Sequence, residues 1–367
     1  MKKILLGTTA VIALGTMSSE AFAAEKIKLE LGGFMRHYVG LTNSDEVAST
    51  RSDAARDKDI SQWSNTEIYF TGNTTLDNGI KVAARVEMEA DGASTSNVDR
   101  SWLTISSDAM GALSIGHHPH FGDGNLVRVP NAGNFDWGDT DSWAGTAVAS
   151  TADTTGFATS APDISDAGGD SAKLKYISPN FSGVTVGFSY SAAEAGNASD
   201  ARRVDGTAED GYTFGAAWSG DLGGAAVSAD LTRMNFGGNN QDVTHAGLNV
   251  GMAGFTVGGG YSDFNDTATG SSAADGEAWE LGVSYATGPY SVSAGYMAAK
   301  NKDTVATPGD NKDTKWNIAA TYDMGAGVAL TADYFHSKAD PEGNGTSIAN
   351  GKSTTISGLI AGIEVGF

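Results

Sequence analysis

The sequence of 367 residues has no cysteine, only seven prolines and a low proportion of charged residues, 18%. The absence of cysteine excludes a disulfide scaffold and a zinc site built on thiolates. A formal net charge of -21 would repel phosphate backbones, which argues against a nucleic-acid-binding protein. Beyond residue 23, no stretch is apolar over about 18 residues, so we expect no transmembrane helix in that part.

The first 23 residues have the features of a secretory signal peptide. Lys2 and Lys3 form a basic end, residues 4–17 are mostly apolar, and Ala21-Phe22-Ala23 fits the small-x-small cleavage pattern. The alternative, an N-terminal membrane anchor, would need a longer apolar stretch of about 20 residues. We therefore expect an exported protein whose mature domain is 24–367. Cleavage would remove two lysines and one glutamate and make the chain one charge more negative.

The rest of the chain alternates between apolar and polar residues with a period of two. In 80–89, one face carries Ile80, Val82, Ala84, Val86 and Met88, and the other carries Lys81, Arg85, Glu87 and Glu89. Segments 279–285 and 315–322 show the same alternation. A helix would need apolar residues three and four positions apart. Strands with one apolar and one polar face fit a closed transmembrane barrel, the form in which strands cross a membrane.

Alternation alone would also fit a soluble β-sandwich, and two further features favour the membrane barrel. Aromatic residues stand at the ends of the apolar faces, as the two interfacial girdles require: Tyr190, Tyr212, Trp218, Tyr285, Tyr290, Tyr322 and Tyr334. Short turns also alternate with longer polar loops. The short turns are expected at 75–79, 108–111, 179–183, 220–223, 251–254, 287–289 and 323–327.

The segments add up to an all-β fold, a sixteen-stranded antiparallel transmembrane β-barrel. The expected strands are 27–40, 64–73, 80–90, 99–107, 112–118, 171–178, 183–192, 211–220, 224–234, 243–251, 254–263, 277–286, 289–299, 314–323, 327–337 and 354–367. The even number suits a bacterial barrel, and a barrel of this size leaves an aqueous channel.

One connection is much longer than the others. Between Gly116 and Ser171 lie roughly fifty residues without a convincing strand, and a stretch of this length is usually functional or disordered. It contains Pro130, Phe135, Trp137 and Trp143, which give it side chains to pack with. Because only the lumen is large enough to hold it, we expect this loop to fold inward and narrow the channel.

Four motifs resemble the general trimeric bacterial porins. Residues 64–72 (SNTEIYFTG), followed by 76–82 (LDNGIKV), resemble their strand 2–turn–strand 3 hairpin. Residues 102–116 are similar to the strand 4–turn–strand 5 hairpin, and 176–183 (YISPNFSG) to the strand 6–turn–strand 7 link. The chain also ends in Phe367, as those proteins typically do. The resemblance extends from about Ile27 to Phe367.

This resemblance implies a homotrimer whose third external loop, here 118–170, bends into the lumen. In the family, acids on that loop face bases on the wall, and small hydrophilic solutes diffuse through. The corresponding acids are Asp136, Asp139 and Asp141, with Asp123 as a further candidate. The basic side departs from the pattern, because Glu67 stands where many members have arginine and His117 follows Gly116. Alternation supplies substitutes on the inner face: Arg36, Lys81, Arg85, Lys173 and Lys175.

The final strand is expected to carry an assembly signal. Leu359, Ala361, Ile363, Val365 and Phe367 alternate with Gly358, Gly362, Glu364 and Gly366. The first set would face lipid and the second set the channel water. The outward Ile363, Val365 and Phe367 resemble the signal that the barrel assembly machinery reads, and the same strand would also close the barrel against the first.

Three other groups of residues could form a binding site, but each fits a structural role better. His117, His118 and His120 with Asp123 could ligate a metal, but their loose spacing favours polar residues at a loop root. Calcium bound by acidic loops, such as the Asp136–Asp141 segment, is an alternative, although no twelve-residue calcium loop is present. The run Gly258-Gly259-Gly260 opens no helix and therefore indicates close packing or an inward gap, not a phosphate cradle. We expect no metal centre, no cofactor and no catalytic residues.

The sequence thus predicts a pore in the outer membrane of a Gram-negative bacterium that passes small hydrophilic solutes and ions. Its acidic charge predicts a preference for cations. Expected partners are outer-membrane lipid and lipopolysaccharide, two further copies of the chain and the barrel assembly machinery. The main alternative is a non-conducting structural or adhesive barrel, and a secreted enzyme or soluble sandwich is the third.

Overall fold

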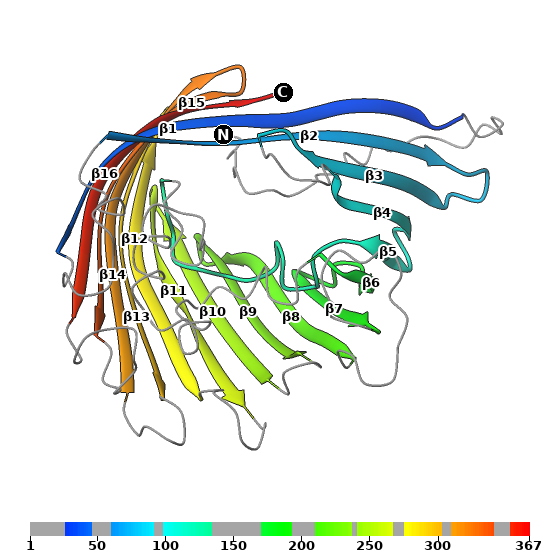
Figure 1. Cartoon of the computed structure of the whole chain (residues 1–367). Coiled ribbons are helices and arrows are strands. Elements are labelled where there is room, and N and C mark those ends of the chain that lie inside the picture. Colours follow the sequence, from blue (N-terminus) through cyan, green and yellow to red (C-terminus); the bar gives the residue numbers. More distant parts are fainter. Residues whose placement is uncertain are drawn as a thin grey trace.

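The computed structural model describes residues 26–45, 60–91, 98–133, 170–192, 210–236, 241–266, 275–302, 310–340 and 353–367. Its strands are all antiparallel to their neighbours and close into a barrel, with β1 paired to both β2 and β16 (Figure 1). Among the described residues, no helix is long and apolar enough to cross a membrane. The predicted signal peptide, 1–23, lies outside the described residues and stays a prediction.

The sixteen strands confirm the predicted fold class and strand number. Their bounds are β1 Lys28–Asp45, β2 Ile60–Thr75, β3 Lys81–Glu89, β4 Val98–Ser107, β5 Gly111–His117, β6 Ala172–Ile177, β7 Val184–Ser191, β8 Gly211–Leu222, β9 Ala225–Phe236, β10 Gln241–Met252, β11 Phe255–Asp266, β12 Gly276–Thr287, β13 Tyr290–Lys302, β14 Asp310–Gly325, β15 Val328–Asp340 and β16 Thr354–Gly366.

Several strands extend beyond their predicted ends on the side of the long loops, and the extension is longest in β1, β2 and β14. β1 continues to Asp45, whereas the prediction ended at residue 40, and β2 and β14 begin at Ile60 and Asp310 rather than at 64 and 314. These extensions are mostly polar on both faces. Backbone pairing holds them in the sheet, so the alternation of hydrophobicity did not reveal them.

The two faces of the barrel have the polarity expected for a membrane protein. On one face large apolar side chains are exposed, such as Leu281 at 57%, while polar side chains on the other face, such as Glu280 and Asn317, are buried. A soluble β-sandwich would show the reverse distribution, with apolar side chains buried. The outward face therefore suits lipid, which confirms the transmembrane barrel and excludes the soluble sandwich.

Aromatic side chains on the outer face form pairs across neighbouring strands near both ends. Near the short turns, Tyr290 stacks on Tyr322 with ring centroids 5.0 Å apart, and Phe255 lies 4.5 Å from Tyr285. Toward the long loops, Trp279 pairs with Tyr296 and Trp316 with Tyr334, both at 5.4 Å. Two levels of rings with aliphatic residues between them match the interfacial girdles of a membrane barrel.

Tight turns connect the strands at one end, close to the predicted positions. In the turns at Ala253-Gly254 and Ala326-Gly327 both central residues have positive φ, between 51° and 86°. Two successive residues of this kind make a type I′ turn, whose twist matches that of the strands it joins. Alanine in the first of these positions is strained, so glycine in the second supplies most of the conformational freedom.

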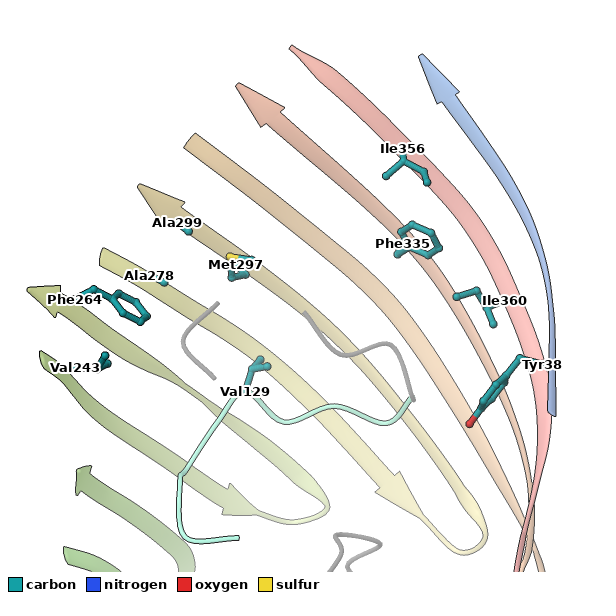
Figure 2. Close-up of a cluster of buried hydrophobic side chains, with 10 residues drawn as sticks. All are labelled: Tyr38, Val129, Val243, Phe264, Ala278, Met297, Ala299, Phe335, Ile356 and Ile360. Atoms are coloured by element: carbon teal, nitrogen blue, oxygen red, sulfur yellow. The ribbon is translucent and has the colours of Figure 1, made fainter. Parts of the chain in front are cut away.

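Part of the inner face is apolar, which the alternation did not predict. A cluster of buried side chains lines the inner wall from β10 to β1 (Figure 2). Its members are Tyr38, Val129, Val243, Phe264, Ala278, Met297, Ala299, Phe335, Ile356 and Ile360. Val129 belongs to the chain after β5, so this inner core joins the barrel wall to a segment inside it.

The barrel closes where β16 meets β1. The backbone of Phe367 is hydrogen-bonded to that of Gly33 in both directions, at 3.0 and 3.1 Å. Inside the seam, the Tyr38 hydroxyl donates to Glu364 Oε1 (2.6 Å), and Arg36 Nε lies 3.5 Å from the same carboxylate. Ile363 and Phe367 have exposed side chains on the outer face, as the alternation predicts.

Deletion of Phe367 is expected to destabilise the closed barrel. The deletion removes two backbone hydrogen bonds of the seam, which together contribute about 1–3 kcal/mol. The temperature at which the refolded protein loses its compact migration in detergent electrophoresis should fall. Phe367→Tyr, which keeps the backbone and the ring, should behave like the unchanged protein. An equal transition temperature for the deletion and Phe367→Tyr would contradict this view of the seam.

Candidate functional site

The chain that follows β5 lies inside the barrel. Residues 118–133 run along the inner wall from β6 to β15, and in Figure 1 they are the cyan trace above the green and yellow strands. The polar side chains that they contact are the inward-facing ones of these strands, as the next paragraphs show. The remainder of the predicted third loop, 134–169, lies outside the described residues, so its inward course stays a prediction.

Phe121 anchors the start of this segment. Its side chain is fully buried and packs against the inner wall where β7 and β8 carry glycine, at Gly187 and Gly215. A Cβ atom at Gly187 would collide with the Phe121 ring. The Phe121 N–H donates to Ser189 Oγ on β7 (2.7 Å). Missing side chains on the wall therefore create the space that the aromatic ring occupies.

Two buried carboxylates hold the middle of the segment. Asp230 Oδ1 on β9 accepts the N–H of Val127, and Glu280 Oε1 on β12 accepts the N–H of Val129, both at 2.7 Å. Glu280 also pairs with the Arg128 guanidinium at 3.2 Å. Ionised acceptors make stronger hydrogen bonds than neutral ones. Both acids thus accept hydrogen bonds from backbone N–H groups of a segment that is not paired in the sheet.

Side-chain amides and hydroxyls continue the attachment beyond the acids. Asn249 Nδ2 on β10 donates to the Arg128 carbonyl (2.9 Å), and the Ala132 N–H donates to Ser293 Oγ on β13 (2.8 Å). Thr321 on β14 donates to the Ala132 carbonyl. The segment is therefore attached to strands on more than half of the barrel circumference, and its position is determined by the wall.

Inward-facing glycines let the backbone approach this closely. At Gly247 a Cβ atom would collide with the Val127 carbonyl, and at Gly282 it would lie 2.5 Å from Val129 Cγ2. Gly260 faces inward beside His245 and Glu280. The interpretation of the glycine run on β11 as a place of close packing is confirmed. Each of these glycines faces either the segment or a residue that holds it.

The opposite wall, β1 to β4, carries two of the predicted basic residues. Arg36 on β1 pairs with Glu364. Arg85 on β3 donates from Nε to Glu87 Oε1 at 2.6 Å. Lys81 lies near the short-turn end instead, where its Nζ is 3.0 Å from Asp108 in the turn between β4 and β5.

Lys173 and Lys175 on β6 secure the beginning of the segment. Lys175 Nζ donates to the carbonyl of Pro119 (2.9 Å), and Lys173 Nζ donates to Ser171 Oγ (2.7 Å). Lys173 is buried at 5% exposure. Their ammonium groups therefore satisfy protein oxygens at the loop root, next to the lumen.

Sequence reasoning missed two arginines of the lumen. Arg100 on β4 bonds to Asp170 Oδ1 (2.7 Å) and lies 3.6 Å from Glu87, and Arg128 pairs with Glu280. Arg100 shares the inner face with Trp102 two residues on, so alternation within the predicted strand 99–107 could have found it. Arg128 carries no periodic signal, because it lies outside the strands.

The predicted acids are only partly described. Asp123, a candidate of the acidic side, lies in the segment and interacts electrostatically with Arg100 and Lys175. Asp136, Asp139 and Asp141 lie outside the described residues, so their place at the constriction stays a prediction. The described lumen instead contains further acids on the wall, among them Glu67 and Glu87.

The three histidines at the end of β5 are not brought together. His117 belongs to the outward set of β5, whereas His118 and His120 are buried on the inside. Within the described ranges, no group of three or more His, Cys, Asp and Glu residues could hold a metal ion. Burial, together with the Lys175 ammonium, lowers the pKa of His118 to about 4, so its ring is neutral at pH 7.

Comparisons with known proteins agree with this architecture. A family model described as Gram-negative porin matches residues 8–341. The anion-selective porin from Comamonas acidovorans is similar in structure, with a TM-score of 0.60 and 19% identity over 93% of this chain and 100% of that chain. A mutant of the Rh. blastica porin has a TM-score of 0.59 and 18% identity over the same shares, 93% and 100%.

A third similar structure is the trimer form of OmpT, an outer membrane protein of Vibrio cholerae. It has a TM-score of 0.60 and 14% identity, over 94% of this chain and 100% of that chain. None of the curated proteins matches the sequence. At these identities the structural likeness concerns the fold.

Glu280→Ala is expected to release the middle of the inner segment. The change removes the acceptor of the Val129 N–H and leaves Arg128 without its carboxylate, which should weaken the local attachment by about 3 kcal/mol. Limited proteolysis within 118–133 should become faster, and the barrel itself should still fold. Glu277→Ala, on the outer face of the same strand, is the matched control. Equal cleavage rates in the two variants would show that Glu280 does not hold the segment.

His118 is expected to make stability depend on pH. Because its folded pKa lies below the ordinary value of about 6.5, the unfolded chain takes up a proton first. Its contribution is complete above pH 6.5 and decreases as the pH falls toward 4. Thermal unfolding in detergent should therefore show a smaller loss over this range for His118→Gln than for the unchanged protein. His37→Gln, on the outer face, should retain the full loss.

Proposed function

The chain belongs to the Gram-negative porin family, whose model matches most of its length, and we propose that its pore carries small hydrophilic solutes and prefers cations. It is a protein of the outer membrane and forms a diffusion pore there. The solute class and the ion preference are the parts that we add. No enzymatic activity and no cofactor are part of this proposal.

The observation that carries the proposal is the charged inner wall of β1 to β4, where arginines and carboxylates stand side by side across from the attached segment. Residues 118–133 are attached to strands between β6 and β14, whereas Arg36, Arg85 and Arg100 stand on β1 to β4. Opposed charges create a field across a channel. A polar solute can align its dipole with this field and replace lost water by contacts with the walls. An apolar solute gains no comparable compensation.

The preference for cations rests on the pairing of the basic groups. Each arginine of this wall has a carboxylate partner: Glu87 lies 2.6 Å from Arg85, and Asp170 lies 2.7 Å from Arg100. Glu67 on β2 faces Glu89 on β3 in register, which places two carboxylates side by side at the lumen. The predicted acids Asp136, Asp139 and Asp141 would add to them. The Comamonas acidovorans porin is anion-selective, so ion preference has to be tested separately in each chain.

We also propose that the rest of the third loop continues inside the barrel. The buried apolar cluster of the inner wall supports this, because side chains such as Phe335 and Met297 are fully buried on the lumen side. Apolar groups facing water in a channel would lose the stabilisation of burial. A loop containing Phe135, Trp137 and Trp143 has suitable side chains to cover them.

A homotrimer is the proposed assembly, with the outer face of β1 to β5 as its interface. Leu31, Val39, Leu103 and Ile115 are exposed there, and the outer ring pairs belong to β11–β15. Rings favour the lipid interface, whereas aliphatic residues permit close contact between copies. The remaining outer surface would face lipid and lipopolysaccharide, and Ile363, Val365 and Phe367 would be read by the barrel assembly machinery.

Single-channel recordings in planar bilayers test the pore and its ion preference. We expect conductance steps in groups of three and a cation-selective reversal potential under a salt gradient. The double change Asp136→Asn with Asp139→Asn should move the reversal potential toward zero. Asp263→Asn, an outward-facing acid on β11, should leave it unchanged. A folded, inserted protein without conductance would favour the alternative, a structural or adhesive barrel.

A further inference from the structure

Aromatic rings and guanidinium groups contact one another in a row along the inner wall of β1 to β4. The Arg36 guanidinium carbon lies 4.1 Å from the centroid of the Phe34 ring, and Phe34 meets Tyr69 edge-on at 6.1 Å. The Arg85 guanidinium carbon lies 4.1 Å from the Tyr69 centroid and 5.7 Å from that of Trp102. We call Arg36, Phe34, Tyr69, Arg85 and Trp102 the ladder. They form one continuous row across four strands.

The register of the strands places the ladder on the lumen side. Phe34 on β1 stands opposite Glu67, and Arg85 on β3 stands opposite Trp102 on β4. Their neighbours Met35 and Leu103 point outward and are exposed. The anchors of residues 121–132 are on β7 to β14, so that part of the segment leaves the ladder wall uncovered. The Arg36 and Arg85 side chains keep 33% and 20% of their exposure.

Each arginine uses only part of its hydrogen-bonding capacity. Arg85 donates from Nε to Glu87, and Arg36 faces Glu364 with its Nε. Among the described residues, the two terminal nitrogens of each guanidinium have no hydrogen-bond partner. A guanidinium offers five N–H donors in a plane, and a carboxylate can accept two of them in parallel. Both arginines can therefore accept an anionic group from the lumen without losing their present contacts.

The rings add a requirement that a simple ion does not meet. The lining of a water-filled pore is normally polar, whereas the ladder contains three aromatic side chains whose ring surfaces are apolar. Rings attract other rings at offset or edge-to-face geometries, and guanidinium planes attract ring faces. A solute that carries both a flat ring and a carboxylate would satisfy the rings and the free N–H groups together.

We propose that the ladder is a binding site for aromatic carboxylates that enter the pore. The proposal rests on the pore function and names the solute class for one wall of it. A neutral sugar has no anionic group for the N–H donors of Arg36 and Arg85 and no aromatic ring to pack edge-on or offset against Phe34 and Tyr69. An organic cation would meet the positive charge of Arg36 and Arg85. Glu67, Glu87 and Glu364 partly neutralise the site, so binding stays weak enough for passage.

Benzoate is the probe, and acetate, cyclohexanecarboxylate and glucose are the comparators. Added to one side of a bilayer that contains the open pore in potassium chloride, benzoate should reduce the current at about a tenfold lower concentration than acetate. Cyclohexanecarboxylate, which is apolar but not flat, should resemble acetate. Calorimetric titration of the detergent-folded protein with benzoate measures binding without any need for conductance.

Substitutions identify the ladder as the site. Tyr69→Leu and Phe34→Leu should each weaken benzoate binding about fivefold, while Tyr69→Phe, which keeps the ring, should retain it. Arg85→Gln should weaken benzoate and acetate alike. Phe70→Leu, the outward neighbour on β2, should change nothing and serves as the matched control. Compact migration in detergent electrophoresis verifies that each variant is folded.

Three outcomes would overturn the proposal: equal binding of benzoate and acetate, stronger binding of glucose, or full benzoate binding by Tyr69→Leu. Normal potassium chloride conductance together with any of these would reject the ladder and leave the pore intact. Absent conductance with benzoate binding in the titration would reject the pore function and keep the ladder as a binding site.

Discussion

The need to satisfy backbone hydrogen bonds away from water governs this structure. In lipid a free N–H or C=O group has no partner, so a sheet can cross the membrane only when its edges are joined. Here β16 pairs with β1 over most of their length, and Phe367 bonds to Gly33 at the end of the seam. Closure encloses the lumen, and the polar side chains that alternate along each strand point into it.

A closed barrel with an inner segment has two different inner walls. On β7 to β15, glycines and buried carboxylates receive residues 118–133, so the wall and the segment pack as a small protein core would. On β1 to β4, charged and aromatic side chains remain accessible. One wall of the lumen therefore holds the inner segment, and the other presents its side chains to solutes. This difference is the physical basis of the proposed pore function and of the proposed binding site.

The strands and their faces could be predicted because the alternation of apolar and polar residues is a local property of the sequence. Ile80, Val82 and Arg85 show their faces through their spacing alone, and the inward positions of Arg36 and Arg85 followed from it. Arg128 could not be found in this way, because it lies in the loop and pairs with Glu280 far away in sequence. The inner apolar cluster was missed for a related reason. Alternation shows that Phe335 and Tyr334 point to opposite faces of the sheet, but it does not show that part of the lumen wall is apolar.

The amino-acid sequence by itself determined the strand number, the antiparallel order, the two faces and the family. These properties depend on contacts between neighbours along the chain or across a single short turn. Only the tertiary structure decided which inward residues hold the inner segment and which face the open lumen. Phe121 reaches Gly187, and Val129 reaches Glu280, across the barrel's curvature. Contacts of that kind exist only after the strands have paired into the curved sheet, because the partners lie far apart in the sequence.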